Sequence, residues 1–214
     1  MKTAKNLIQL YKQESAQVFN SIADDDIENL VDVVWDSYQR GSTIFACGNG
    51  GNAGFVANLI QDLICNPFVT EDKSESLNLK KRLIAIDLCA SPAMITGLMN
   101  DLGPDSVFSG QVEVYAKKGD VIIGFSGSGG SKNILEAFVA GRERETVNVL
   151  ITRNPDGKCA THCDLVIEIP GNSTFPGQTG KNNNNFHYED CLAKLSHVVT
   201  GILKGKIQDE LKSQ

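Results

Sequence analysis

Short apolar runs recur along the chain from residue 43 onward, each followed by a turn rich in glycine or serine and then by a helical stretch. The five runs span residues 43–47, 83–88, 121–125, 147–152 and 165–169. They lack polar alternation, which is typical of strands buried on both faces of a parallel sheet covered by helices. We therefore predict an α/β fold with a five-stranded parallel sheet, in which ligands bind at the carboxyl ends of the strands.

The first forty residues follow a different pattern, in which apolar residues recur at helical spacing and predict two helices. Asp24, Asp25 and Asp26 precede the second of these helices and are expected to supply its N-terminal cap and a favourable charge. A last helix is expected from about His187 to about Leu211. We treat residues 1–214 as one domain, with a helical pair over 1–40 and an α/β core over 41–214. The polar stretches 66–81 and 171–185 are predicted to be loops, and loops of this length often border a site.

Composition narrows the classes of function. The chain has 41% apolar and 21% charged residues, as globular proteins do. No apolar run approaches the roughly 20 residues of a membrane span, and the N-terminus does not resemble a signal peptide. We therefore expect a cytoplasmic protein with reduced cysteines and no membrane partner. With 20 basic and 26 acidic residues the net charge is −6, which argues against direct nucleic-acid binding but not against a small anionic ligand.

Two glycine-rich loops carry most of the chemical information. The first, residues 47–54, comes at the end of the first strand, and the second, residues 125–132, comes at the end of the third strand. Glycines let the backbone approach an anion, and the helix that follows each loop offers unpaired N–H groups. Both loops match nucleotide-binding patterns only weakly, because the acidic residue expected after the first and the Gly-Lys-Ser/Thr of the second are missing. Either loop alone could be a tight turn, whereas two on one sheet favour a phosphorylated small molecule.

The sequence resembles the sugar isomerase (SIS) superfamily. The resemblance lies in the two loops, in Met99-Asn100-Asp101 and in the segments 107–112 and 119–133. The resemblance covers nearly the whole chain and is closest to the phosphoheptose isomerases, which convert sedoheptulose 7-phosphate to D-glycero-D-manno-heptose 7-phosphate. It implies a homotetramer with sites between subunits, an arrangement that suits the N-terminal helical pair. It also implies that the sugar phosphate contacts Asn49, Gly50, Gly51, Asn52, Asn100, Asp101, Ser126, Gly127, Ser128, Ser131 and Glu189.

The catalytic positions depart from the family pattern. Where the family has His, Glu, Gln and His as zinc ligands, this chain has Asn58, Asp62, Glu189 and His197. The resemblance implies that Asp62 is the base and that His197 moves protons between the substrate oxygens. A divalent metal would bind these four positions, zinc by resemblance or a harder ion because two are carboxylates. Glu189 and His197 are about 12 Å apart on a straight helix, so one metal needs an irregular helix or two subunits.

The leading interpretation is a phosphosugar aldose–ketose isomerase, acting on sedoheptulose 7-phosphate in heptose synthesis for lipopolysaccharide or capsule. One alternative is a non-catalytic SIS protein that binds a phosphosugar or a protein, like the replication-initiator-associating branch. Another is an isomerase or epimerase of a different sugar phosphate. His197 could also be a hydrogen-bonded histidine at a helix interface, because Leu195, Val198 and Val199 surround it in the sequence.

Overall fold

A computed structural model describes residues 3–77, 79–180 and 184–213 of the protein. All five predicted strands are present, as β1 (Thr43–Gly48), β2 (Ile84–Asp87), β3 (Val121–Phe125), β4 (Val147–Thr152) and β5 (Leu165–Glu168). They form one parallel sheet in the order β2-β1-β3-β4-β5. The predicted fold class is therefore confirmed.

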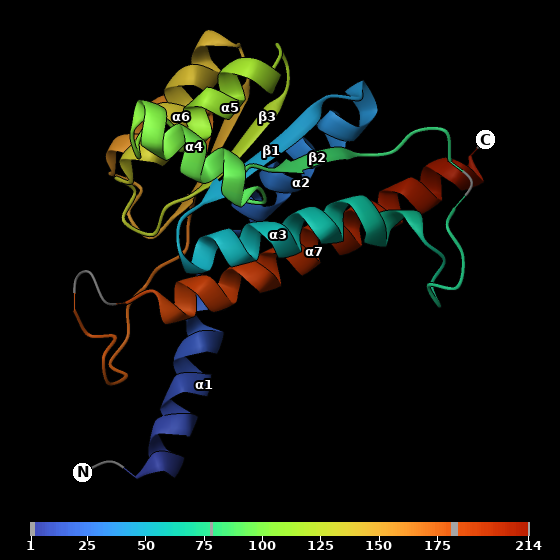
Figure 1. The fold of residues 1–214 in the computed structure, drawn as a ribbon. Coiled ribbons are helices and arrows are strands. Elements are labelled where there is room, and N and C mark those ends of the chain that lie inside the picture. The colour runs from blue at the N-terminus through green and yellow to red at the C-terminus, as the bar shows by residue number, and fades with distance from the viewer. Residues whose placement is uncertain (1–2, 78, 181–183, 214) are drawn as a thin grey trace.

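Helices cover both faces of the sheet (Figure 1). On one face lie α2 (Asp24–Arg40), α3 (Gly51–Cys65) and α7 (Phe186–Lys212), and on the other lie α5 (Ser106–Tyr115) and α6 (Lys132–Glu143). A further helix, α4 (Pro92–Leu102), packs on α5. Successive side chains of β1 point to opposite faces, so Ile44 and Ala46 join one core cluster while Phe45 and Cys47 join the other.

The edge strand β2 differs from the expectation of full burial. Its side chains alternate, and Ile84 and Ile86 are 48% and 37% exposed. The reason is its place at the edge of the sheet, where only β1 pairs with it. Sequence pattern alone does not separate an edge strand rich in isoleucine from a central one, because strand order depends on distant parts of the chain.

The N-terminal helices are α1 (Ala4–Asn20) and α2, as predicted. Thr3 caps α1, since its hydroxyl accepts from the Asn6 N–H and the Asn6 side chain bonds back to the Thr3 N–H. The expected aspartate cap of α2 is wrong: Ala23 occupies the cap position without a side-chain bond, and the three aspartates form the first helical turn. There their charge still complements the positive end of the helix dipole.

The two polar stretches are mostly irregular. Residues 66–81 contain a short 3-10 helix (Asn66–Phe68) and an isolated bridge between Val69 and Ser76, and Phe68 is fully buried. A second 3-10 helix, Lys158–His162, precedes β5. Residues 171–180 and 184–185 form the loop before α7, while the rest of that expected loop lies outside the described residues. All six cysteines are free, and no helix in the described ranges has the length and apolar character needed to span a bilayer.

Candidate sugar phosphate site

The first glycine loop turns β1 sharply into α3. Gly50 occupies the cap position of α3 with φ 58° and ψ −123°, a conformation that favours glycine. Gly48 must also be glycine, because a Cβ there would lie 2.8 Å from the Asn52 Cβ. The loop therefore brings backbone N–H groups to the start of α3, a position suited to polar or anionic ligands.

The second glycine loop is held together by its own serines. The buried Ser126 hydroxyl donates to the Ser131 hydroxyl at 2.9 Å, and the Gly130 N–H donates to the Ser128 Oγ at 3.3 Å. Gly129 has φ 66°, and a Cβ there would lie 2.4 Å from the Asn154 carbonyl oxygen. The loop thus places hydroxyls and N–H groups directly before α6, as expected for a phosphate-binding turn.

The two loops meet at one point of the sheet. The strands β1 and β3 are neighbours, whereas the chain reaches β2 on the opposite side of β1 before it returns to β3. Open α/β sheets bind ligands at such a switch in strand order. The amide side chains of Asn49 and Asn133 exchange two hydrogen bonds, of 2.9 and 2.8 Å, and so join the first loop to the start of α6.

The first turn of α7 covers both loops. A Cβ on Gly51 would lie 2.9 Å from the Glu189 carboxylate, and a Cβ on Gly127 would lie 3.0 Å from the Asn185 Oδ1. Burial raises the pKa of Glu189, with a further contribution from Asp190, although Arg153 opposes the shift. The structure therefore places Glu189 against the first glycine loop.

A second cluster forms around Asp62, which is only 5% exposed. Its carboxylate accepts from Asn58 Nδ2 at 3.0 Å and from Asn66 Nδ2 at 2.7 Å. The Ser196 hydroxyl donates to it at 3.4 Å, and His197 Nε2 lies 3.6 Å away. Asn58, Asp62 and His197 therefore meet: the helical spacing predicted that Asn58 and Asp62 share a face, and the family resemblance implied that His197 lies near them. Asn66 and Ser196 were missed, although Asn66 stands one further helical turn along the same face.

The Asp62 cluster and the glycine loops lie apart within one chain. Asp62 follows Gly51 by eleven residues on α3, which corresponds to about 16 Å along the helix axis. Glu189 and His197 belong to the same unbroken helix α7, which runs beside α3 (Figure 1). Of the two routes to a shared metal, an irregular helix is thus ruled out.

The four predicted metal ligands do not fit one ion within one chain. Glu189 lies at the glycine loops, and both carboxylate oxygens of Asp62 already accept hydrogen bonds from asparagine amides. Within the described ranges, no three His, Cys, Asp or Glu side chains are grouped closely enough to hold a metal. A divalent metal therefore stays a prediction, and we derive no chemical step from it.

Asn100 and Asp101 lie near the end of α4, and both are exposed. The Asn100 Nδ2 donates to the Asp101 carboxylate at 2.8 Å. Neither side chain forms a hydrogen bond with a glycine loop in the described part of the chain. In the single chain they are thus not joined to the rest of the predicted substrate contacts.

A cavity of about 950 Å³ borders the second glycine loop. Its wall includes Gly127, Ser128, Arg153, Glu14 of α1 and hydroxyls of the loop before α7. None of the first loop's residues line this cavity. Arg153 was missed by sequence reasoning, although its place directly after a predicted strand is where α/β proteins bind ligands.

The sequence is similar to a known domain family and to named members of it. Residues 10–152 match the SIS domain family. The phosphoheptose isomerase of Rhodospirillum rubrum is 33% identical over 171 residues, which cover 78% of this chain and 85% of that protein. The one from Clostridium acetobutylicum is 29% identical over 175 residues, with 79% and 85% covered.

A solved phosphoheptose isomerase from Neisseria gonorrhoeae has the same fold. It superposes with a TM-score of 0.77 at 22% identity, covering 95% of this chain and all of the other. Sequence, fold and loop geometry thus agree with the resemblance found in the motifs. The chain belongs to the SIS domain family and, within it, to the phosphoheptose isomerases.

Proposed function

We propose that this protein interconverts sedoheptulose 7-phosphate and D-glycero-D-manno-heptose 7-phosphate. The observation that carries the proposal is the meeting of two glycine loops at the switch in strand order, in a chain whose relatives are named phosphoheptose isomerases. The reaction moves a proton between adjacent carbons and moves a carbonyl from C2 to C1. It therefore needs a phosphate site, a base and a proton donor near the sugar oxygens.

The second glycine loop is our proposed phosphate site. Ser126, Ser128 and Ser131 would supply hydroxyl donors, and the backbone of Gly127 leaves room for a close approach. The first loop, with Asn49, Gly50, Gly51 and Asn52, and Glu189 beside it, would bind sugar hydroxyls. Replacing Ser126 and Ser128 together with alanine should mainly weaken binding, because each donor to a charged group contributes about 1.5–3 kcal/mol.

The chemical step is assigned to Asp62 and His197. Asp62 would take a proton from C1 and return it to C2, while His197 would move a separate hydroxyl proton from O1 to O2. The His197 side chain is 68% exposed and the Asp62 side chain is buried, so a substrate can reach the pair from the His197 side. A divalent metal, zinc or a harder ion, would need Asn58, Asp62, Glu189 and His197 to come from two subunits, and neither proton transfer depends on it.

The separation between the two clusters supports a site built from two chains. A seven-carbon sugar phosphate is shorter than the distance of about 16 Å from Gly51 to Asp62 along α3. Within a homotetramer, the Asp62 and His197 pair of one subunit could complete the glycine loops of another. The proposal includes a cytoplasmic location, which suits six unpaired thiols.

A binding protein without catalysis is the second candidate. It is favoured by the amide donors around Asp62, because Asn58 and Asn66 already occupy both oxygens of the proposed base. An isomerase of another sugar phosphate would share the phosphate site and differ in contacts to the sugar. The two isomerases would exchange substrate protons with different sugar phosphates, whereas the binding protein would exchange none.

The deciding experiment follows proton exchange in heavy water. Wild-type protein is incubated with sedoheptulose 7-phosphate in D₂O, and the recovered sugar phosphates are examined by NMR and mass spectrometry. We expect deuterium beside the carbonyl together with the aldose product. Exchange only into another pentose, hexose or heptose phosphate would identify a different isomerase. Tight binding across that panel without any exchange would establish the binding protein.

A further inference from the structure

Arg153 lies in a slot that two glycines leave open. It directly follows β4, and its N–H donates to the Gly127 carbonyl at 3.3 Å. A Cβ on Gly127 would lie 3.2 Å from the Arg153 Nε, and a Cβ on Gly171 would lie 2.5 Å from its Cδ. Side chains larger than hydrogen at these two positions would therefore displace the arginine. The slot holds the guanidinium against the second glycine loop.

The charge of Arg153 has no anionic partner among the residues that the structure describes. Arg142, by contrast, pairs with Asp164 at 2.9 Å. Nη1 of Arg153 donates to the amide oxygen of Asn184, which is neutral, and its buried Nε has no hydrogen-bond partner within the described ranges. Burial lowers the pKa of Arg153, against the influence of Tyr188 and Glu189. A partly buried, unpaired cation is unfavourable unless an anion joins it.

The second glycine loop needs such a cation from elsewhere. Its own lysine, Lys132, is bonded to Asp105, which lies before α5. The loop therefore presents hydroxyls and N–H groups to a ligand but no uncommitted positive charge of its own. A phosphate monoester carries nearly two negative charges at neutral pH. Arg153 and the loop residues Gly127 and Ser128 line the same cavity of about 950 Å³.

We propose that Arg153 pairs with the phosphate of the substrate while the second glycine loop surrounds it. A guanidinium offers paired N–H donors that match phosphate oxygens, and among the described residues only Nη1 of Arg153 donates to another side chain. Arg153 is then the residue that makes the site prefer a phosphorylated sugar over the same sugar without phosphate. The identity of the sugar rests on the proposed function, whereas the pairing of Arg153 with a phosphate group does not.

The test compares Arg153→Gln and Arg153→Lys with Arg144→Gln, which removes an equal charge from an exposed position at the end of α6. Steady-state kinetics with sedoheptulose 7-phosphate and calorimetric titration with inorganic phosphate are measured for each. For Arg153→Gln we expect KM and the phosphate Kd to rise about 10- to 100-fold, with kcat within about 3-fold of wild type. Arg153→Lys should show a smaller rise, because it keeps the charge but loses the paired donors.

The two arms of the test separate this inference from the proposed function. A wild type that binds phosphate but does not isomerise sedoheptulose 7-phosphate contradicts the proposed function, and the phosphate titration still decides the role of Arg153. Unchanged phosphate affinity in Arg153→Gln overturns the inference, as does an equal loss in Arg144→Gln. If circular dichroism shows that Arg153→Gln is unfolded, the Arg153→Lys titration decides alone, and wild-type affinity there overturns the inference.

Discussion

At the scale of single residues, three carboxylates have different surroundings and hence different expected roles. Asp62 is buried among amide donors beside His197, Glu189 lies against a glycine backbone with a raised pKa, and Glu14 is bonded on several sides. The Asp62 carboxylate lies beside the exposed His197, whereas His187, the histidine bonded to Glu14, is buried. This difference supports the proposed proton transfer by Asp62 and His197.

Asp62→Asn and His197→Gln should each lower turnover at least 100-fold, because general acid–base catalysis contributes about 10²–10⁴-fold. The affinity for inorganic phosphate should stay close to wild type, since the second glycine loop is untouched. Turnover and deuterium exchange are measured together. Asp209→Asn, which changes an exposed carboxylate on α7, is the control and should retain activity. Turnover within a few-fold of wild type in Asp62→Asn would remove that residue from the mechanism.

Glu14 is expected to make stability depend on acid pH. Burial alone would raise its pKa, but hydrogen bonds from Ser173, Thr174 and His187 outweigh it and lower the pKa from 4.5 to about 2. The stabilisation is therefore complete above about pH 4.5 and is lost as the pH falls toward 2. Glu14→Gln should lose about 1–3 kcal/mol of unfolding free energy at neutral pH.

Denaturant unfolding at several pH values measures this effect. Between pH 5 and pH 2.5 the wild type should lose more stability than Glu14→Gln does, because the variant has no charge to lose at that position. Parallel pH curves for the two proteins would mean that the hydrogen bonds around Glu14 do not stabilise the fold. The hydrogen bonds around Glu14 join α1 to the loop before α7, where Phe175 packs against Tyr11 of α1.

At the scale of elements, close packing between β3 and α6 supports the second glycine loop. A Cβ on Gly124 would lie 2.5 Å from the Phe138 ring and 2.9 Å from an Ile134 methyl group. Both neighbours are buried, so neither can move freely. The absence of a side chain at Gly124 therefore sets how closely α6, and the loop before it, approaches the sheet.

Gly124→Ala should reduce the free energy of unfolding by about 1–3 kcal/mol through overpacking. Gly97→Ala is the matched control, because its added Cβ meets nothing within 4 Å on helix α4. That control should be neutral or stabilising by up to about 1 kcal/mol. Chemical denaturation of both variants measures the difference. Equal stability of the two would show that β3 and α6 adjust without cost.

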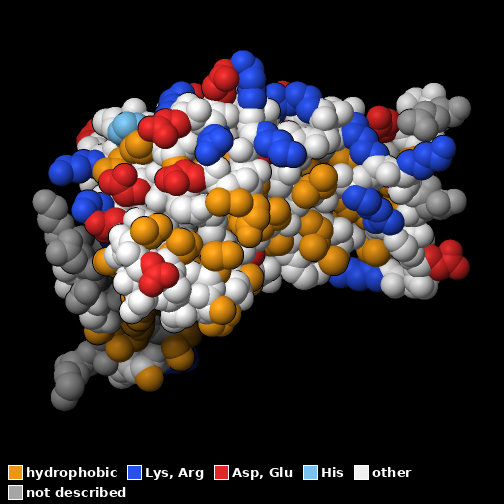
Figure 2. All heavy atoms as spheres, turned by 45° about the horizontal axis from the view of Figure 1, so that its top comes forward, with side chains coloured by type: hydrophobic (Ala, Val, Ile, Leu, Met, Phe, Trp, Pro, Cys, Tyr) orange, Lys and Arg blue, Asp and Glu red, His pale blue; other side chains and the backbone are white. Residues whose placement is uncertain are grey.

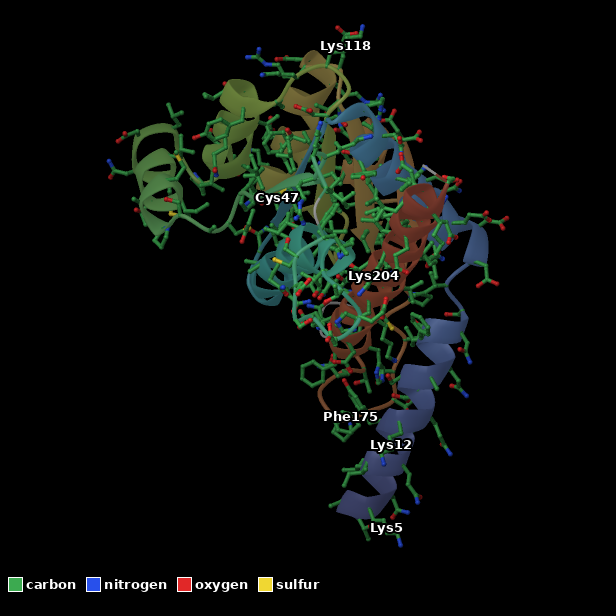
Figure 3. All side chains as sticks on the ribbon, turned by 90° about the vertical axis from the view of Figure 1, so that its right-hand side faces the viewer. Lys5, Lys12, Cys47, Lys118, Phe175 and Lys204 are labelled. Carbon is green, nitrogen blue, oxygen red and sulfur yellow. The ribbon has the colours of Figure 1, made fainter. Side chains whose placement is uncertain are left out.

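At the scale of the whole molecule, helix α1 extends away from the sheet and its covering helices (Figures 1 and 3). Lys5 on α1 and Lys118 beside the sheet lie at opposite ends of the view in Figure 3. Apolar side chains also reach the surface, among them Ile8 at 56%, Leu102 at 64% and Val114 at 75% exposure. Figure 2 shows apolar side chains spread across the middle of one face. Extended apolar surface of this kind is typical of proteins that assemble.

We expect the wild type to be a tetramer and Ile8→Glu to shift it toward smaller species. A charge on the apolar side of α1 would have to be buried in the assembly, which is unfavourable without a partner. Turnover should fall with the loss of tetramer, because the proposed site needs two subunits. Sedimentation velocity and activity are measured at the same concentrations. Lys5→Glu, also on α1, is the control for charge alone, and a monomeric active wild type would contradict the prediction.

The strands, the helices and the two glycine loops of this protein can be predicted from local sequence. Apolar runs without polar alternation located all five strands, and glycines between strand and helix located both loops, because these patterns reflect backbone conformation within a few residues. The spacing of Asn58 and Asp62 placed them on one face of α3 for the same reason. The motifs were specific enough to indicate the family that comparison then confirmed.

Tertiary structure decided what depends on neighbours distant in sequence. Strand order exposed β2 at the edge, and an unbroken α7 separated Glu189 from His197. The slot of Arg153 arises only when Gly127 and Gly171, 44 residues apart, approach the same side chain. Sequence patterns report the periodicity of one element, whereas burial, pairing of charges and the shape of a site depend on which elements pack together.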